Sequence, residues 1–167
     1  GGGGGGGGRP GGAVGGGELE MCANMRGAGD GSAASARGLA EAVALAKVVG
    51  GKLRLVHIVN ELIIAPAYPA GMQSGQVVES MRAHGQSVLQ ASEKQVRAAG
   101  LEPESVMIES VGGAAGDLIV EQANKWGAEL IVLGTHGRRG IKRMVLGSDA
   151  EHVVRQSSVP VLLVRAP

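Results

Sequence analysis

Two observations predict an open, doubly wound α/β fold for this chain. Segments with helical periodicity alternate with short apolar segments over most of its 167 residues. The short segments are continuous apolar runs, such as Leu130-Ile131-Val132-Leu133, which are typical of parallel strands buried on both faces. Right-handed crossovers between such strands place helices on both faces of one sheet. The length suits a single domain with a sizeable core.

The amino-terminal segment has a different composition from the rest of the chain. Residues 1–17 are almost all glycine. Such a composition buries too little apolar surface to offset the entropy of ordering it. We therefore expect a flexible glycine-rich tail over residues 1–20 and a folded domain over residues 21–167.

The first expected strand ends at Asp30. Asp30-Gly31-Ser32 then supplies turn and capping residues, although a carboxylate at the end of a strand can also approach a ligand. Apolar residues at helical spacing predict a helix over residues 32–49, which Gly50-Gly51 ends. The next strand is predicted over residues 53–59.

The second half of the chain repeats this alternation. The longest helix is predicted over residues 77–99, before Gly100. The remaining predictions are a strand over 106–111, a helix over 117–126, a strand over 130–133, a helix over 148–156 and a strand over 161–164. Ligands of such folds bind beyond the carboxyl ends of the strands, where the strand order reverses.

A glycine-rich segment lies between the strand at 130–133 and the helix at 148–156. It follows the spacing Gly134-x2-Gly137-x9-Gly147-Ser148. Glycines let the backbone approach a ligand, and the free N–H groups of the helix that starts at Ser148 favour an anion. Its cationic residues are Arg138, Arg139, Lys142 and Arg143. We interpret the segment as a phosphate-binding loop; the alternative is a surface loop with solvated basic residues.

Composition excludes several classes of protein. The net charge of +1 predicts no strong attraction to nucleic acid or to an anionic membrane. No segment has the 18 or so apolar residues of a membrane helix. The single cysteine, Cys22, excludes an internal disulfide framework, and no Cys/His group has zinc-ligand spacing. We expect a cytoplasmic protein without nucleic-acid or membrane partners.

The sequence does not indicate dedicated catalysis. The four histidines are scattered and form no recognisable triad, paired carboxylates are absent, and the pattern G-x4-G-K-[S/T] does not occur. His136 is notable because it lies inside the glycine-rich loop. His57, His84 and His152 are interpreted as structural or surface residues, and Met81, Met107, Met144 and Trp126 as packing residues.

Residues 30–164 resemble the universal stress proteins of the UspA type. The spacing from Gly134 to Ser148 coincides with the G-2x-G-9x-G-[S/T] signature of the ATP-binding branch, and residues 158–164 look like the last strand of the family. The resemblance implies a five-stranded, parallel, Rossmann-like sheet of the adenine nucleotide α-hydrolase type. It also implies a homodimer formed through the carboxyl-terminal strand.

The resemblance implies ATP, with Mg²⁺, as the ligand. By matching position, Asp30 and Ile58 would lie near the ribose and adenine, and Arg138 would add charge at the triphosphate. The residues that would surround the ribose and phosphates are Gly134, His136, Gly137, Gly147 and Ser148.

The function implied is that of a nucleotide-dependent regulator of stress tolerance. Two alternatives stay open: an interaction module of the same fold that binds no nucleotide, and a weak ATP hydrolase. An α-hydrolase-like enzyme would have a Ser-Gly-Gly-x-Asp-Ser loop after the first strand, where this chain has Gly29-Asp30-Gly31-Ser32.

The chain departs from the family pattern at three places. Glu129 stands where an aspartate is common, and Asp149 stands where a small or β-branched neutral residue is usual. Residues 25–30 occupy the place of an aliphatic first strand, yet they include Arg26 and two glycines. A central strand of that composition loses buried area and adds a charge.

Overall fold

The computed structural model of the chain describes residues 20–24, 33–60, 74–135 and 146–165. Strands and helices alternate, which confirms the α/β class. In chain order the elements are β1 (Glu20–Asn24), α1 (Ala33–Val49), β2 (Lys52–Asn60), α3 (Ser74–Ala98), β3 (Glu104–Ser110), α4 (Ala115–Trp126), β4 (Leu130–Thr135), α5 (Ser148–Gln156) and β5 (Val161–Arg165).

Most element boundaries lie within three residues of the predicted ones. Helix α5 has the predicted bounds, and β4 continues two residues further, to Thr135. Gly127 ends α4 in the left-handed conformation at φ 76°, and its N–H donates back to the carbonyls of Ala123 and Asn124. Glycine adopts this conformation without the penalty that a Cβ imposes, which explains the accurate prediction of this helix end.

The prediction for the first strand was wrong in position. The strand that pairs with β2 and β4 is Glu20–Asn24, with Met21 opposite Leu53 on one side and Leu130 on the other. Residues 25–30, where that strand was expected, fall outside this strand and outside the described part of the chain. Glycines and an arginine suit a central strand poorly, and Glu20–Asn24 contains none of them.

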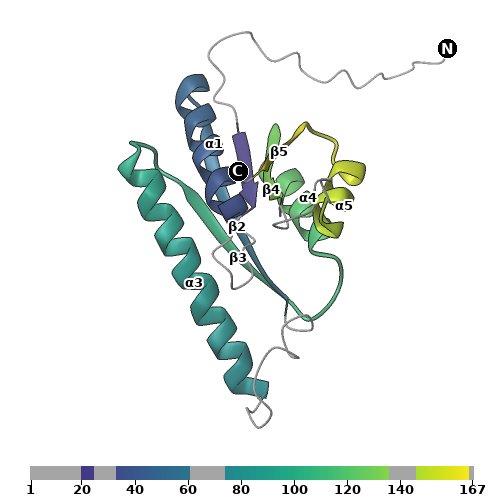
Figure 1. Cartoon of the computed structure of the whole chain (residues 1–167). Helices are drawn as coiled ribbons and strands as arrows, with labels where there is room; N and C mark the ends of the chain where they lie inside the picture. Colours follow the sequence, from purple (N-terminus) through teal and green to yellow (C-terminus); the bar gives the residue numbers. More distant parts are fainter. Residues whose placement is uncertain (1–19, 25–32, 61–73, 136–145, 166–167) are drawn as a thin grey trace, which may run out of the picture.

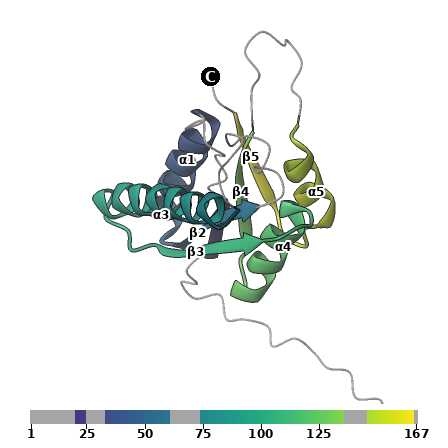
Figure 2. The same ribbon diagram turned by 90° about the horizontal axis from the view of Figure 1, so that it is seen from below.

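The strands form one sheet in the order β3-β2-β1-β4-β5, and every neighbouring pair is parallel. Helices α1 and α3 cover one face, and α4 and α5 cover the other (Figure 1 and Figure 2). From β1 the chain builds outward to β3 and then returns to place β4 on the opposite side of β1. The strand order therefore reverses between β1 and β4.

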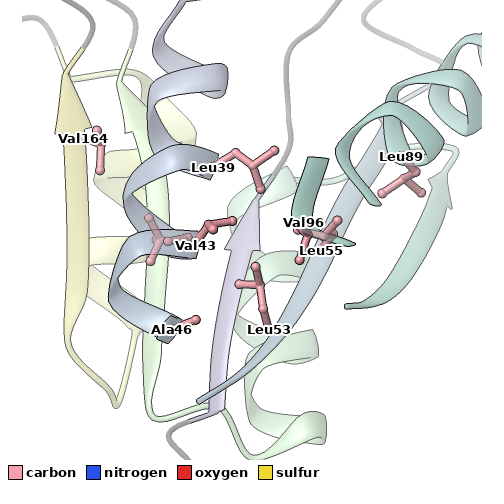
Figure 3. Close-up of a cluster of buried hydrophobic side chains, with 10 residues drawn as sticks. Leu39, Val43, Ala46, Leu53, Leu55, Leu89, Val96 and Val164 are labelled. Carbon is pink, nitrogen blue, oxygen red and sulfur yellow. The ribbon is translucent and has the colours of Figure 1, made fainter. Parts of the chain in front are cut away.

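Two apolar clusters hold the helices to the two faces. Strand β2 contributes to both because successive side chains point to opposite faces: Leu55 packs toward α1 and α3, whereas Val56 and Ile58 pack toward α4. Figure 3 shows the first cluster, in which α1 inserts Leu39 and Val43 against the strands. A strand that is buried on both faces needs apolar residues in succession, which explains its continuous apolar sequence.

Helix α1 approaches β4 closely at Gly38. A Cβ added to Gly38 would lie 3.3 Å from the backbone nitrogen of Gly134 and 3.5 Å from its Cα. The absence of a side chain at position 38 therefore allows the helix to rest on the backbone of β4. This contact places α1 directly against the carboxyl-terminal residues of β4.

At the amino-terminal end of the sheet, Arg54 joins β2 to β3 and α4. Its guanidinium carbon lies 5.0 Å from the ring centroid of Trp126, and its Nη2 donates to Glu104 Oε2 at 2.8 Å. The hydrogen bond from Arg54 holds the pKa of Glu104 below its usual value. The packing role expected for Trp126 is confirmed.

We predict that Gly38→Val lowers the free energy of unfolding by about 1–3 kcal/mol, because the added carbons push α1 off β4. Urea unfolding provides the measurement. Gly75→Val is the matched control, since an added Cβ at Gly75 in α3 meets no atom of the described residues within 4 Å. Equal stability of the two variants would contradict the contact.

We predict that Arg54→Leu costs about 1 kcal/mol at pH 7 through loss of the cation–π contact and the ion pair. Because the folded-state pKa of Glu104 is lowered, the ion-pair part exists above the ordinary glutamate pKa and disappears as pH falls through the folded value. The difference between wild type and Arg54→Leu should therefore shrink on acidification.

Trp126 is the single tryptophan, so its fluorescence emission can be used to monitor unfolding, and it is sensitive to the contact with Arg54. Arg37→Leu is the control for loss of an arginine. Arg37 lies on the surface of α1, where its Nη2 is 3.4 Å from Glu41 Oε1 of the same helix. A stability difference independent of pH would argue against the Arg54–Glu104 pair.

Candidate functional site

The candidate site lies at the carboxyl edge of β1 and β4, where the strand order reverses. These strands are neighbours, with Asn24 opposite Leu133. The two strands therefore end side by side, and residues 25–32 and 136–145 follow them in the sequence. In open α/β sheets this reversal forms the crevice in which ligands bind.

The structure describes four of the eight predicted site residues: Ile58, Gly134, Gly147 and Ser148. The other four, Asp30, His136, Gly137 and Arg138, lie outside the described residues. Ile58 is 4% exposed and lies toward the carboxyl end of β2, with its side chain in the α4-facing cluster. Gly134 is the next-to-last residue of β4, and α1 rests on its backbone through Gly38.

The amino terminus of α5 completes the described part of the site. Gly147 is the N-cap residue, at φ −61° and ψ 150°, and its carbonyl accepts the first helical hydrogen bond from the Glu151 N–H at 2.9 Å. Among the residues that the structure describes, no side chain is recorded as capping this helix end. Ser148 is exposed as the first helical residue. The first N–H groups of α5 therefore point out of the amino-terminal end of the helix, and no described side chain caps them. Helix ends of this kind bind anions.

No close contact within the described residues requires a glycine at position 147. Its φ is one that any residue adopts, and a Cβ added there would meet no described atom within 4 Å. Gly38 and Gly116, by contrast, are required by close contacts. A glycine without such a contact leaves room for a ligand to approach the backbone.

Acidic residues also occupy the first turn of α5. Glu151 forms an ion pair with Arg155 at 2.6 Å, one turn further along the helix. Asp149 is partly buried, and its carbonyl oxygen lies against α4 near Gly116. Carboxylates in a first turn stabilise the helix dipole, but they also reduce the attraction for a bound anion.

The α4–α5 seam, formed by Gly116, Asp117, Asp149 and His152, was not identified from the sequence. His152 Nε2 and Asp117 Oδ1 are 2.5 Å apart, and Gly116 packs beneath the His152 side chain. The sequence carried one usable signal, because a glycine inside a helical pattern commonly has a packing cause. The same signal marks Gly38 in α1.

The carboxyl end of β4 is also tied to β5. The Thr135 hydroxyl donates to the carbonyl of Val164 at 3.2 Å, and Thr135 is 3% exposed. This bond satisfies a buried hydroxyl and fixes the last residue of β4 before the glycine-rich loop begins.

The other residues considered from the sequence mostly have the expected places. His57 and Met81 are buried in the sheet–α3 layer and His84 is exposed on α3, whereas Met144 lies outside the described residues. Within the described ranges, no three His, Cys, Asp or Glu side chains gather in a way that suits a metal ion. None of the helices described there is both long and apolar enough to cross a membrane.

Comparison with known proteins agrees with this architecture. The model of the universal stress protein family matches residues 27–165. Universal stress protein MJ0531 of Methanocaldococcus jannaschii is 32% identical over 140 residues, which cover 83% of this chain and 79% of that protein.

Two solved structures share the fold. The structure of MJ0577 from Methanocaldococcus jannaschii has a TM-score of 0.71 at 20% identity, over 89% of this chain and 96% of that chain. The structure of the universal stress protein from Archaeoglobus fulgidus in complex with dAMP has a TM-score of 0.58 at 21% identity, over 87% and 97% of the two chains. The resemblance noted from the glycine spacing is confirmed, and the chain belongs to the universal stress protein family.

Proposed function

We propose that this protein binds ATP at the carboxyl edge of β1 and β4 and acts in the cytoplasm as a nucleotide-dependent regulator of stress tolerance. The main support is the β4–loop–α5 unit. In the sequence, a glycine-rich, basic segment connects β4, which lies where the strand order reverses, to the amino terminus of α5, which no described side chain caps. Such a unit presents backbone N–H groups and cations to an anion. A structural neighbour of the same family was solved with dAMP, an adenine nucleotide.

We assign the nucleotide parts to the residues as follows. Ile58, at the carboxyl end of β2, and Asp30 lie near the adenine and the ribose. Arg138 and the amino terminus of α5 at Ser148 meet the phosphates. The backbone around the ribose and phosphates is supplied by Gly134, His136, Gly137 and Gly147.

Magnesium would enter with the nucleotide. Mg²⁺ prefers phosphate and water oxygens and needs only one or two carboxylates from a protein. Asp30 is the carboxylate that we assign to this ion or to its water shell.

Binding without efficient turnover is the activity that fits these groups best. A nucleotide-regulated protein needs differential binding, not a general base. The alternatives are a weak ATP hydrolase and an interaction module that binds no nucleotide. Calorimetric titration with MgATP separates the interaction module from our proposal.

We further propose that β5 pairs with a second copy of the chain. Strand β5 is an edge strand of sequence Val-Leu-Leu-Val-Arg, with Leu162 38% exposed; Val154, on α5, is also exposed. The opposite edge, β3, carries Glu104 and Glu109 in ion pairs with arginines. Charged side chains discourage pairing at an edge, whereas an apolar strand end favours it.

We predict that the wild-type protein binds MgATP in the micromolar range and that Gly137→Val abolishes binding, because a side chain there blocks approach of the phosphates. Isothermal titration calorimetry measures both. Gly75→Val, on α3 and without a described neighbour within 4 Å of the added Cβ, should bind as the wild type does. No heat at millimolar ATP would favour the interaction module, and phosphate release at a steady rate would favour the hydrolase.

We predict that Leu162→Glu converts the dimer to a monomer, since it places a charge on the apolar edge. Light scattering coupled to size-exclusion chromatography gives the mass. Val48→Glu is the control, because Val48 is 83% exposed at the end of α1 and is not part of the β5 strand. A wild-type protein that is monomeric at high concentration, or a dimer that survives Leu162→Glu, would contradict the β5 interface.

A further inference from the structure

The α4–α5 seam brings the first turns of two helices into unusually close contact. Gly116 is the second residue of α4 and is buried. A Cβ added to Gly116 would lie 2.9 Å from both Cβ and Cδ2 of His152, and 3.0 Å from the carbonyl oxygen of Asp149. Real Cβ atoms do not approach other atoms this closely, so the packing exists only because position 116 is glycine.

These contacts cannot be relieved by a side-chain rotation. Two of the three atoms, the Asp149 carbonyl oxygen and the His152 Cβ, belong to the α5 backbone or are bonded directly to it. A larger residue at position 116 would therefore displace α5 itself. The seam sets the distance between the two helices.

The residue next to Gly116 completes the seam. Asp117 Oδ1 lies 2.5 Å from His152 Nε2, and the two side chains are 66% and 32% exposed. His152 follows Ser148 by four residues, so it lies on the same side of α5, one turn from the exposed helix start. Two other ion pairs run along these helices, Glu121 with Lys125 on α4 and Glu151 with Arg155 on α5.

Helix α5 depends on this seam for its position. It has nine residues, and Val153 is its one fully buried residue. A helix this short is marginal in isolation, so its tertiary contacts determine where it lies. The seam contacts α5 at Asp149, the residue next to Ser148.

We propose that Gly116 and the Asp117–His152 pair are positioning residues for the phosphate end of the nucleotide site. The inference rests on the proposed function, because it concerns the same site. The seam fixes the distance of the first turn of α5 from α4, and this position lets the N–H groups of α5 reach the phosphates. Hydrogen bonds weaken steeply when distance or angle departs from the optimum, so a displacement of a few tenths of an ångström affects several at once.

The inference makes a prediction about ligand selectivity. A displaced α5 weakens contacts to phosphates but leaves the adenine contacts at β2 in place. Gly116→Ala should therefore weaken MgATP binding about tenfold while adenosine binding changes less than about twofold. A general loss of stability would not separate the two ligands.

Gly85→Ala is the matched control. Gly85 lies in α3 on the opposite face of the sheet, and a Cβ there would lie 2.9 Å from Met107 Sδ, 3.0 Å from His57 Cδ2 and 3.1 Å from Val59 Cγ2. It introduces the same chemical change under similar crowding but away from α5. Urea unfolding verifies that both variants are destabilised, and calorimetry measures both ligands. We expect Gly85→Ala to keep the ATP-to-adenosine affinity ratio of the wild type.

Milder variants test the same inference if Gly116→Ala fails to fold. Asp117→Asn and His152→Gln leave Gly116 in place and change one exposed and one partly exposed side chain. Each should weaken MgATP binding about two- to fivefold, and the double variant should be no weaker than the stronger single variant, because both remove one interaction.

The outcomes separate this inference from the proposed function. A wild-type protein that binds no ATP overturns both. A wild-type protein that binds ATP, with Gly116→Ala lowering ATP and adenosine affinity alike or matching Gly85→Ala, overturns this inference alone. For the milder variants, fully additive losses or unchanged affinity would do the same.

Discussion

The structure depends on the burial of a parallel sheet on both faces. Strands β2 and β4 lie inside the sheet, and their successive residues alternate between the two apolar clusters. In β4, Val132 belongs to the α1-facing cluster, while Ile131 and Leu133 belong to the other. A strand of this kind must be covered by helices above and below, and connections through those helices make every strand run in the same direction. The common direction is what gathers the carboxyl ends at one edge.

Glycines determine how closely the helices approach this sheet and one another. Gly38 lets α1 rest on the backbone of β4, Gly85 lets α3 rest on side chains of β2 and β3, and Gly116 lets α4 meet α5. Each glycine lowers the intrinsic stability of its helix by about 1 kcal/mol relative to alanine. Close packing offsets that cost, since dispersion contacts are lost quickly when surfaces separate.

The two ends of the sheet therefore have different characters. The amino-terminal end is fixed by Arg54, which contacts Trp126 and Glu104 and so joins β2, β3 and α4. At the carboxyl end, the described groups are a helix terminus without a capping side chain and the seam that supports it. A rigid scaffold that carries glycine-rich connections at one edge is the common design of binding sites in α/β proteins.

The sequence by itself determined the α/β class, most helix and strand boundaries and the glycine-rich motif, because each depends on local periodicity, on helix-ending glycines or on residue spacing within one segment. The sequence also predicts Ile58, Gly134, Gly147 and Ser148 as site residues; they lie on β2, β4 and the start of α5, and their role in binding stays a prediction. Only the tertiary structure decided that Glu20–Asn24 is the central strand, since a central strand is selected by its neighbours on both sides. The contacts of Gly38 with Gly134 and of Gly116 with His152 join residues far apart in the chain, so no local pattern could reveal them.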